Sequence, residues 1–386
     1  MSGGDLPMEA YLAALAGLPK VGPAGLRRML RSGPPAVVWE RVATGRLAPA
    51  DLPTRAADPD LLRAAASASS PAEVWERCRR HDVAAVALGS PGYPEALASD
   101  PDPPAVVFLR GDTAVLRTAT VAVVGTRRAT GYGRRVAHEL GAGLAAAGVS
   151  VVSGLALGID AAAHAGALEP GGDAPAERDD VHGATAGPVG VVAAGLDRPA
   201  PHRNAGLARE VARRGLLVSE LPPGCRPEPW RFPVRNRLLV ALADAVVVVE
   251  SGRGGGSMST VGHALDRDRP LLAVPGPVDS PVSEGPNALL SDGALVCTGL
   301  ADVLLAIGRT LPPAAGARPS ADGPPGPDAD GACLLEHLGW QPVTTGSLVE
   351  RSGLSLAVAV PALGRLEDQG WVRRHGGLVE RIGGPR

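Results

Sequence analysis

Arginine and glycine residues directly after a predicted strand give this sequence its clearest chemical signal. Residues 121–124 are apolar and mostly β-branched, which is typical of a buried strand, and Gly125, Thr126 and Arg127 follow them at once. A glycine turn that leads from a strand into a helix presents backbone amides to an anion, and an arginine adds charge-assisted, forked hydrogen bonds. The turn therefore predicts a phosphate site, although a tight turn with a solvated arginine would contain the same residues.

A second glycine loop, residues 153–160 (SGLALGID), ends the next predicted strand and enters a second helix. Ser153 and Gly154 open this loop, and Asp160 falls in the first turn of the helix, where the helix dipole favours a negative charge. His164 lies one helical turn further along on the same face. The spacing is compatible with a catalytic pair, but it favours a helix-stabilising carboxylate beside a buried histidine.

The segment 232–237 (FPVRNR) opens another predicted helix and carries two arginines around one asparagine. Arg235 and Arg237 are suited to phosphate contacts, and Asn236 is suited to reading a base edge. Phe232 is the main aromatic side chain nearby, and only 3% of the residues are aromatic. We therefore expect affinity to come from phosphates and one or two bases, with marked salt sensitivity.

A glycine run at residues 254–256 follows the predicted strand 245–250 and leads into a helix that begins at Ser257. Its position after a parallel strand indicates a further anion cradle. The chain lacks the GxGxxG fingerprint of dinucleotide sites and the GxxxxGK[ST] loop of P-loop proteins. Nicotinamide cofactors and ATP hydrolysis of the P-loop type therefore lose support, and we expect no cofactor and no bound metal.

The elements that must position these segments alternate between strand and helix patterns from about residue 83 to residue 310. Apolar, β-branched runs separated by helical segments imply a parallel sheet covered by helices on both faces. We therefore expect an α/β class with an extended Rossmann-like domain. Beyond 121–124 and the strand before Ser153, the candidate strands are 189–194, 216–219, 245–250 and 271–275. The polar, acidic loop 169–187 is given no function.

A helical domain is predicted on the N-terminal side of the sheet, over residues 1–82. Its alanine-rich helices are of a SAM-like or helix-hairpin-helix-like type. The turn at residues 19–22 (PKVG) lies between two of them. The turn could present the Gly22 amide to a DNA phosphate, or the hairpin could simply pack, and the sequence does not separate these two roles.

A separate winged-helix domain is predicted at residues 332–386, after a Pro-rich linker at 311–331. Its expected helices are 333–338, 347–351 and 356–369, followed by a hairpin of 371–374 and 378–381. We expect Val360, Leu363 and Leu366 to share one face of the third helix. That helix contains few Arg, Asn or Gln residues, which disfavours base reading, so a protein-binding role is at least as well supported.

Composition limits the partners and the cellular compartment. The 386 residues are 45% hydrophobic, which allows a large core and two or three domains. A net charge of −2 argues against coating nucleic acid by bulk charge, so a phosphate site must be a local cluster of arginine. Four scattered cysteines have neither zinc nor disulfide spacing, and no secretory signal or membrane-spanning run is found. We expect a cytoplasmic protein with no membrane partner.

Six ordered motifs together resemble the DNA-processing protein A family, also called DprA or Smf. They are VGTR, SGLALGIDAAAH, AAGLD, FPVRNR, ESGRGGGSMST and AVPG, and they span about residues 88 to 307. The resemblance implies a non-enzymatic protein that binds single-stranded DNA, protects incoming DNA during natural transformation, loads the recombinase RecA and works as a homodimer. Carried onto this sequence, the DNA-binding residues would be Gly125, Thr126, Arg127, Ser153, Gly154, Arg203, Asn204, Phe232, Arg235, Asn236, Arg237, Gly255, Gly256 and Ser257.

The chain departs from the family pattern where the family has Tyr-Pro and this sequence has Ala200 and Pro201, although Arg203 keeps a basic residue before Asn204. Two rival functions stay open. An enzyme related to lysine-decarboxylase-like nucleotide phosphoribohydrolases would need a glutamate after the glycine-rich segment at 254–260, and none is present. A regulator acting through the winged helix would bind duplex DNA in a sequence-specific way.

Overall fold

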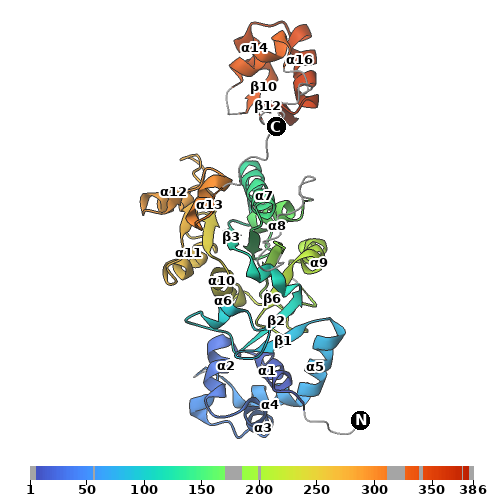
Figure 1. The fold of residues 1–386 in the computed structure, drawn as a ribbon, viewed down its shortest axis with the longest axis vertical. Coiled ribbons are helices and arrows are strands. Elements are labelled where there is room, and N and C mark those ends of the chain that lie inside the picture. Colours follow the sequence, from blue (N-terminus) through green and yellow to red (C-terminus); the bar gives the residue numbers. More distant parts are fainter. Residues whose placement is uncertain are drawn as a thin grey trace. The chain divides into compact units, whose positions relative to one another are not determined.

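The computed structural model describes residues 6–54, 57–169, 185–198, 201–310, 327–338, 342–375 and 377–381. The chain divides into two compact units, Met1–Pro312 and Pro313–Arg386 (Figure 1). Most of the predicted linker at 311–331 and of the acidic loop at 169–187 lies outside the described residues.

A nine-stranded sheet forms the centre of the first unit, in the order β1-β2-β6-β5-β4-β3-β7-β8-β9. Its strands are β1 (Ala84–Ala87), β2 (Val106–Gly111), β3 (Thr120–Val124), β4 (Ser150–Ser153), β5 (Pro188–Val191), β6 (Leu216–Ser219), β7 (Ala245–Val248), β8 (Leu271–Ala273) and β9 (Leu295–Val296). From β6 to β9 every neighbouring pair is parallel, whereas β1 pairs with β2 and β2 with β6 in the antiparallel sense. The predicted α/β class with a mostly parallel sheet is confirmed.

Helices cover both faces of this sheet (Figure 1). They are α6 (Glu95–Ala98), α7 (Gly131–Ala146), α8 (Ile159–Ala167), α9 (Ala205–Arg214), α10 (Arg231–Ala241), α11 (Met258–Leu265), α12 (Glu284–Ser291) and α13 (Leu300–Ala306). Because successive side chains of a strand point to opposite faces, β3 serves both cores. Val121 and Val123 pack with α7, α8 and α13, while Ala122 and Val124 pack with α10, α11 and α12.

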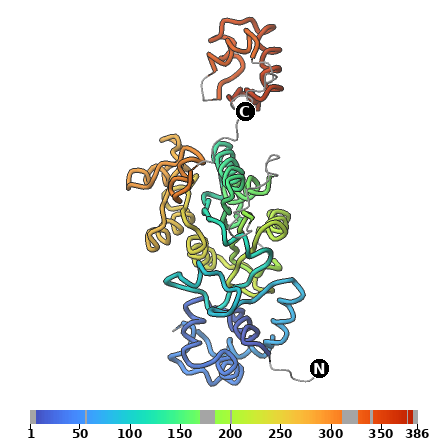
Figure 2. Tube along the Cα trace, in the orientation of Figure 1, coloured from blue at the N-terminus to red at the C-terminus, as the bar shows by residue number. Residues whose placement is uncertain are grey.

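The helical N-terminal part packs against the β1–β2 end of the same unit (Figure 2). Its elements are α1 (Met8–Ala16), α2 (Pro23–Leu30), α3 (Pro35–Ala43), η1 (Pro49–Asp51), α4 (Pro59–Ala68) and α5 (Pro71–Arg80). Buried Leu15 of α1 belongs to the same core as Phe108 of β2 and Leu217 of β6. The predicted boundary between residues 82 and 83 therefore separates elements that share one core.

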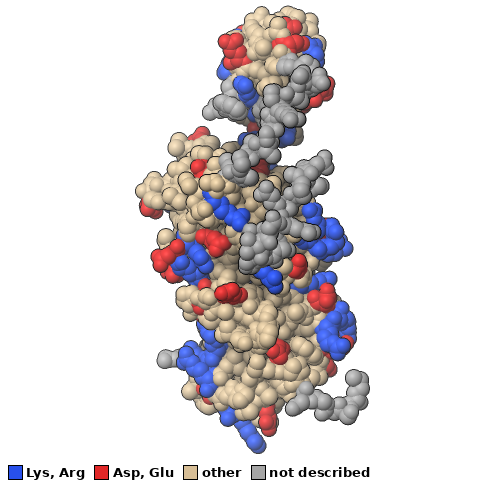
Figure 3. Space-filling view, in the orientation of Figure 1, with Lys and Arg blue, Asp and Glu red and all other residues tan. Residues whose placement is uncertain are grey.

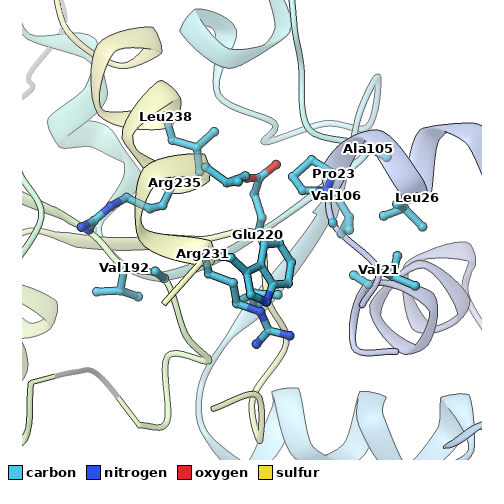
Figure 4. A pocket seen from close by; sticks show the side chains of 16 residues that line it. Val21, Pro23, Leu26, Ala105, Val106, Val192, Glu220, Arg231, Arg235 and Leu238 are labelled. Carbon is cyan, nitrogen blue, oxygen red and sulfur yellow. The ribbon is translucent and has the colours of Figure 1, made fainter. Parts of the chain in front are cut away.

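The turn between α1 and α2 faces the sheet domain. Val21 is buried, and a Cβ on Gly22 would lie 3.3 Å from Cζ3 of Trp230, so the Trp230 ring packs directly on this glycine. The two surfaces line a small, largely apolar pocket of about 40 Å³, and the side chain of Glu220 also lines it (Figure 4). These contacts favour the packing role of the hairpin over a DNA phosphate site at Gly22.

The second unit has a helical layer and a three-stranded sheet in the order β10-β12-β11. Its elements are α14 (Ala329–His337), β10 (Val343–Thr344), α15 (Thr345–Ser352), α16 (Leu356–Asp368), β11 (Val372–His375) and β12 (Leu378–Arg381). The predicted winged-helix layout is confirmed. One detail is wrong: Val360 is 41% exposed, and the buried face of α16 is formed by Ala359, Ala362, Leu363 and Leu366, which follow the i, i+3, i+4, i+7 spacing.

The sequence predicted the central strands better than the outer ones. The expected strands at 216–219, 245–250 and 271–275 correspond to β6, β7 and β8, and the expected 189–194 starts one residue earlier and ends at Val191. The strands β1, β2, β9 and β10 were not predicted, although β2 is six residues long and opens with the apolar run 106–109. No helix in the described part of the chain is long and apolar enough to cross a membrane.

Candidate nucleic-acid interface

A cleft of about 550 Å³, open to solvent, lies at the carboxyl ends of β3, β4 and β7. In open α/β sheets this edge is where ligands bind. All four segments singled out in the sequence contribute residues to it, and the segment 153–160 contributes Ala156 and Asp160. Its lining consists of Val124, Gly125, Thr126, Arg127, Arg128, Ala156, Asp160, Pro229, Phe232, Pro233, Arg235, Asn236, Leu239, Ser251, Gly255, Gly256, Ser257 and Thr260.

The turn after β3 forms one wall of the cleft and requires glycine at its first position. A Cβ on Gly125 would lie 2.5 Å from Cγ1 of Ile159 and 2.8 Å from the Glu250 carbonyl oxygen, so no larger residue fits. The Thr126 amide donates to that same carbonyl at 2.7 Å, and the Arg128 amide donates to Oγ1 of Thr126 at 3.2 Å. These bonds fix the backbone that presents the two arginines.

Arg127 lies exposed at this wall and covers the ring of Phe232. Its guanidinium carbon is 4.9 Å from the ring centroid, a cation–π contact between the turn after β3 and the start of α10. Cationic and aromatic groups, the two kinds that attract phosphates and bases, are therefore adjacent in the cleft. The predicted proximity of these segments, which come from distant parts of the sequence, is observed.

Arg235 occupies the cleft floor as a structural cation and is only 7% exposed. Its Nη1 donates to the Gly154 carbonyl at 3.0 Å and also to the Val191 carbonyl. A Cβ on Gly154 would lie 2.7 Å from Nη2 of Arg235 and 2.7 Å from Oδ2 of Asp160, which explains the glycine. Burial lowers the pKa of Arg235 to about 10, so the side chain keeps its charge at neutral pH.

Asp160 stabilises its own loop rather than pairing with His164. Its Oδ2 accepts hydrogen bonds from the amides of Gly154 at 3.1 Å and Ala156 at 3.3 Å. Burial raises the pKa of Asp160, and the Arg235 guanidinium and the two amides partly oppose that rise. His164 is fully buried, and burial lowers its pKa to about 4, so the imidazole is neutral at pH 7. The geometry supports the helix-stabilising interpretation of this pair.

The glycine-rich loop forms the opposite wall, held by hydrogen bonds of Asn236 and three serines. Nδ2 of Asn236 donates to Oγ of Ser259 at 2.8 Å and to the Gly256 carbonyl at 3.3 Å, and Oγ of Ser257 donates to Oγ of Ser251 at 2.7 Å. A Cβ on Gly255 would lie 2.5 Å from Oγ of Ser251, whereas one on Gly256 would meet open space. The amide of Asn236, predicted to read a base edge, thus also braces the loop.

Arg237 lies outside the cleft lining, in the junction with the N-terminal helices. Its side chain pairs with Glu220, and its Nε lies 3.3 Å from Oδ2 of Asp102. Residues two apart on a helix point about 200° away from each other, so Arg235 and Arg237 cannot face the same cleft. In Figure 4 the side chain of Arg235 extends away from Pro23 and Leu26 of the hairpin.

The remaining predicted residues border the cleft without lining it. Oγ of Ser153 is buried and donates to the Val123 carbonyl at 2.6 Å. Nδ2 of Asn204 donates to the carbonyls of Leu155 at 2.8 Å and Ala156 at 3.1 Å, which holds the loop after β4. Arg203, beside it, is exposed to solvent.

The sequence interpretation omitted several residues that line the cleft. Arg128 follows Arg127 directly, and Ser251 is the second polar residue after the apolar run of β7, so each had a signal in the sequence. Thr260 ends the glycine-rich motif ESGRGGGSMST and so also had a signal, whereas Leu239 had none, because its position depends on how α10 packs. Pro229 and Pro233 likewise enter the cleft only through the path of the segment that leads into α10.

Known proteins share both parts of this architecture. The sequence signature of the family described as DNA recombination-mediator protein A matches residues 84–308, and that of the DprA winged helix domain matches residues 318–377. A Bacillus subtilis protein named DNA processing protein DprA is 34% identical over 226 residues, 58% of this chain and 71% of that protein. A Mycobacterium tuberculosis relative is 45% identical over 188 residues, and the match spans 45% of its length.

A solved structure agrees with the sequence matches. The X-ray structure of DNA processing protein A from Streptococcus pneumoniae covers 78% of this chain and 98% of its own, with a TM-score of 0.62 and 27% identity. Fold and site thus define an α/β protein of Rossmann-like type with an arginine- and glycine-lined cleft and a separate winged-helix unit. The chain belongs to the DNA recombination-mediator protein A family, also named DprA or Smf.

Proposed function

We propose that this chain binds single-stranded DNA in the cleft at the carboxyl ends of β3, β4 and β7. The observation that carries the proposal is the meeting of Arg127, Phe232 and the glycine-rich loop at 255–257 around one open cavity. Arginine and loop amides suit phosphate oxygens, and an aromatic ring suits a base. Membership of a DNA-processing family supports nucleic acid as the ligand.

A single strand fits this arrangement better than a duplex does. Phe232 is half-buried in the cleft, beside Arg127, and a base must leave its neighbours to stack on it. Bases of a duplex are already stacked and paired, whereas those of a single strand can be turned toward an aromatic side chain. Affinity then rests on few phosphates, since the chain has a net charge of −2, and it falls steeply with salt.

The proposal includes the biological role of the family. The chain would protect incoming DNA, deliver it to the recombinase RecA during transformation or recombination, and work as a homodimer through its sheet domain. Its cleft would bind DNA without catalysing a reaction. Asp160, a carboxylate in the cleft lining, accepts hydrogen bonds from amides of its own loop, which supports a structural role.

Fluorescence anisotropy with a labelled oligonucleotide of about 20 residues tests the binding, because single-strand sites span roughly 4–16 nucleotides per module. We expect the single strand to bind at least tenfold more tightly than the same sequence as a duplex. Equal or tighter duplex binding would contradict the proposal. Incubation with deoxynucleoside monophosphates is the companion assay, in which release of free base would favour the rival enzyme function.

A further inference from the structure

The rim of the cleft continues beyond Ala156 across the loops that follow β5 and β6. Asn204, in the segment after β5, bonds to the Ala156 carbonyl at 3.1 Å. The Gly195 amide donates to the Cys225 carbonyl at 3.0 Å, and the Gly224 amide donates to Oδ1 of Asp197 at 2.8 Å. Since neighbouring parallel strands end at the same edge, these bonds join three successive strand ends into one continuous ridge.

The ridge is also attached to the aromatic wall of the cleft. Nη1 of Arg231 donates to the Arg226 carbonyl at 2.7 Å, which ties the loop after β6 to the first turn of α10. Pro229 and Phe232, a few residues further along the same segment, line the cleft itself. A bound polymer beside Phe232 therefore reaches Arg226 if it continues along this protein segment toward lower residue numbers.

Exposed cations occupy this ridge, and the nearby carboxylates are engaged. Arg203 and Arg226 are exposed and form no ion pair with any described residue, and the side chain of Arg198 is 61% exposed, with its Nε 3.6 Å from Asp197. The side chain of Asp197 is only 6% exposed and also accepts a hydrogen bond from a backbone amide, and Glu228 pairs with Arg231 at 2.8 Å. The ridge therefore carries a net positive charge available to a phosphate.

The opposite end of the cleft has the opposite balance. The loops after β7 and β8 expose Arg253 and Asp279, and Glu284 is exposed at the first position of α12. Phosphates are repelled by this side and attracted by the ridge after β5 and β6. This difference in charge between the two ends favours a bound strand that leaves the cleft over the loops after β5 and β6.

We propose that single-stranded DNA leaving the cleft runs over the loops after β5 and β6, with its backbone phosphates on Arg198 and Arg226. This inference rests on the proposed function and adds a second contact region to it. Arginine suits the role because its planar fork binds phosphate oxygens in a bidentate manner. The cleft alone then serves short strands, while longer ones also engage the ridge.

Two oligonucleotide lengths separate the cleft from the ridge. Anisotropy is measured with strands of about 5 and about 20 nucleotides, at several salt concentrations, for the wild type and the double variant Arg198→Ala, Arg226→Ala. We expect the short strand to bind the variant as it binds the wild type. The long strand should lose roughly tenfold in affinity, and its salt slope should fall by about 1.4, or about 0.7 for each lost phosphate contact.

The matched control is the double variant Arg46→Ala, Arg63→Ala, which removes the same charge from exposed positions near α3 and α4, in the helical N-terminal part that contributes no residue to the cleft lining. If both double variants bind the long strand alike, with the same salt slope, the ridge is not a contact and the inference fails. The single variant Arg226→Glu should weaken long-strand binding more than Arg226→Ala does, because it replaces the positive charge by a negative one. Absence of wild-type binding to both lengths would instead overturn the proposed function.

Discussion

Single side chains in and near the cleft divide into those available to a ligand and those engaged by the protein. Arg127 is exposed and its guanidinium lies over the Phe232 ring, so its replacement removes a ligand contact without unpairing a buried group. We expect Arg127→Ala to weaken single-strand binding by about 1–3 kcal/mol and to change the free energy of unfolding by less than about 0.5 kcal/mol. Anisotropy measures the affinity, and urea denaturation measures the free energy of unfolding. An unchanged affinity would show that Arg127 is not part of the binding site.

Arg235 and Arg237 show which part of the site the sequence can predict. The FPVRNR segment correctly placed a helix start at the cleft, but both arginines are buried and bonded to protein partners. Helical periodicity alone shows that they face different directions. Which of them faces the cleft depends on the carboxylates of Glu220 and Asp102, and those come from loops whose position the sequence does not give.

Glu220 links stability to pH through the junction with the N-terminal helices. Its side chain is only 12% exposed and lies beside Arg237, and this partial burial raises the pKa of its carboxyl from 4.5 to about 7. The folded chain therefore holds this proton more tightly than the unfolded chain, and the contribution of Glu220 to stability decreases as the pH rises from 4.5 to about 7.

Glu220→Gln removes that titration and keeps the shape of the side chain. We expect the variant to gain stability relative to the wild type between about pH 5 and about pH 8, as measured by the urea midpoints of both proteins. Asp102, Arg27 and Arg237 surround the group and are unchanged by the substitution. A constant difference between the two midpoints at both pH values would contradict the raised pKa.

Helix α7 anchors the arginine turn. It begins at an N-cap, Thr130, which is also bonded to the carboxylate of Glu250. Oγ1 of Thr130 accepts from the Gly133 amide at 3.1 Å and donates to Oε1 of Glu250 at 2.5 Å, while the Thr130 amide donates to Oε2 at 2.9 Å. Glu250 is only 2% exposed, so it depends on these donors. The cap joins the end of β7 to the helix that follows β3.

Loss of this cap should weaken the whole element. We expect Thr130→Ala to lower the free energy of unfolding by about 1–2 kcal/mol, because a helix cap and a partner of a buried carboxylate are lost together. Thr130→Ser keeps the hydroxyl and should retain most of the stability. Urea denaturation compares the two variants, and equal losses in both would show that the methyl group, rather than the cap, matters.

Element prediction succeeded for most strands in which local pattern and burial agree; β2 is the exception, because its first four residues are apolar and buried but the strand was missed. The valine-rich runs of β3 and β7 are buried on both faces and were recognised, whereas β1 has the sequence AAVA and β9 is only two residues long. Alanine has low strand preference, and such strands are specified by their partners instead. The antiparallel pairing of β2 with β6 is likewise a tertiary contact with no local signal.

At the scale of the molecule, the net charge is −2, and no large basic face is seen on the side shown in Figure 3. On the side shown in Figure 3, basic and acidic side chains are interspersed. Binding of nucleic acid must then depend on a few local cations, as the cleft and its ridge provide, and not on a general field. The sequence predicted this from the net charge of −2.

The two compact units have separate hydrophobic cores, which allows the contribution of the winged helix to be tested. Leu334, Leu348 and Leu363 belong to the core of the second unit, and every residue of the cleft lining lies in the first. A chain that ends at residue 310 therefore keeps the complete cleft, and its single-strand affinity should stay within about threefold of the full chain, a difference below about 0.7 kcal/mol.

The exposed face of α16 argues against a large duplex-binding contribution from the removed unit. Leu356, Val358 and Val360 are exposed there, and Arg365 is paired with Asp328, so the helix that would enter a major groove offers apolar side chains instead of base-reading groups. Titration of single-stranded and duplex DNA with the full and shortened chains makes the comparison. A loss of single-strand affinity greater than tenfold on truncation would place an essential part of the binding surface in the winged-helix unit and contradict a cleft that suffices by itself.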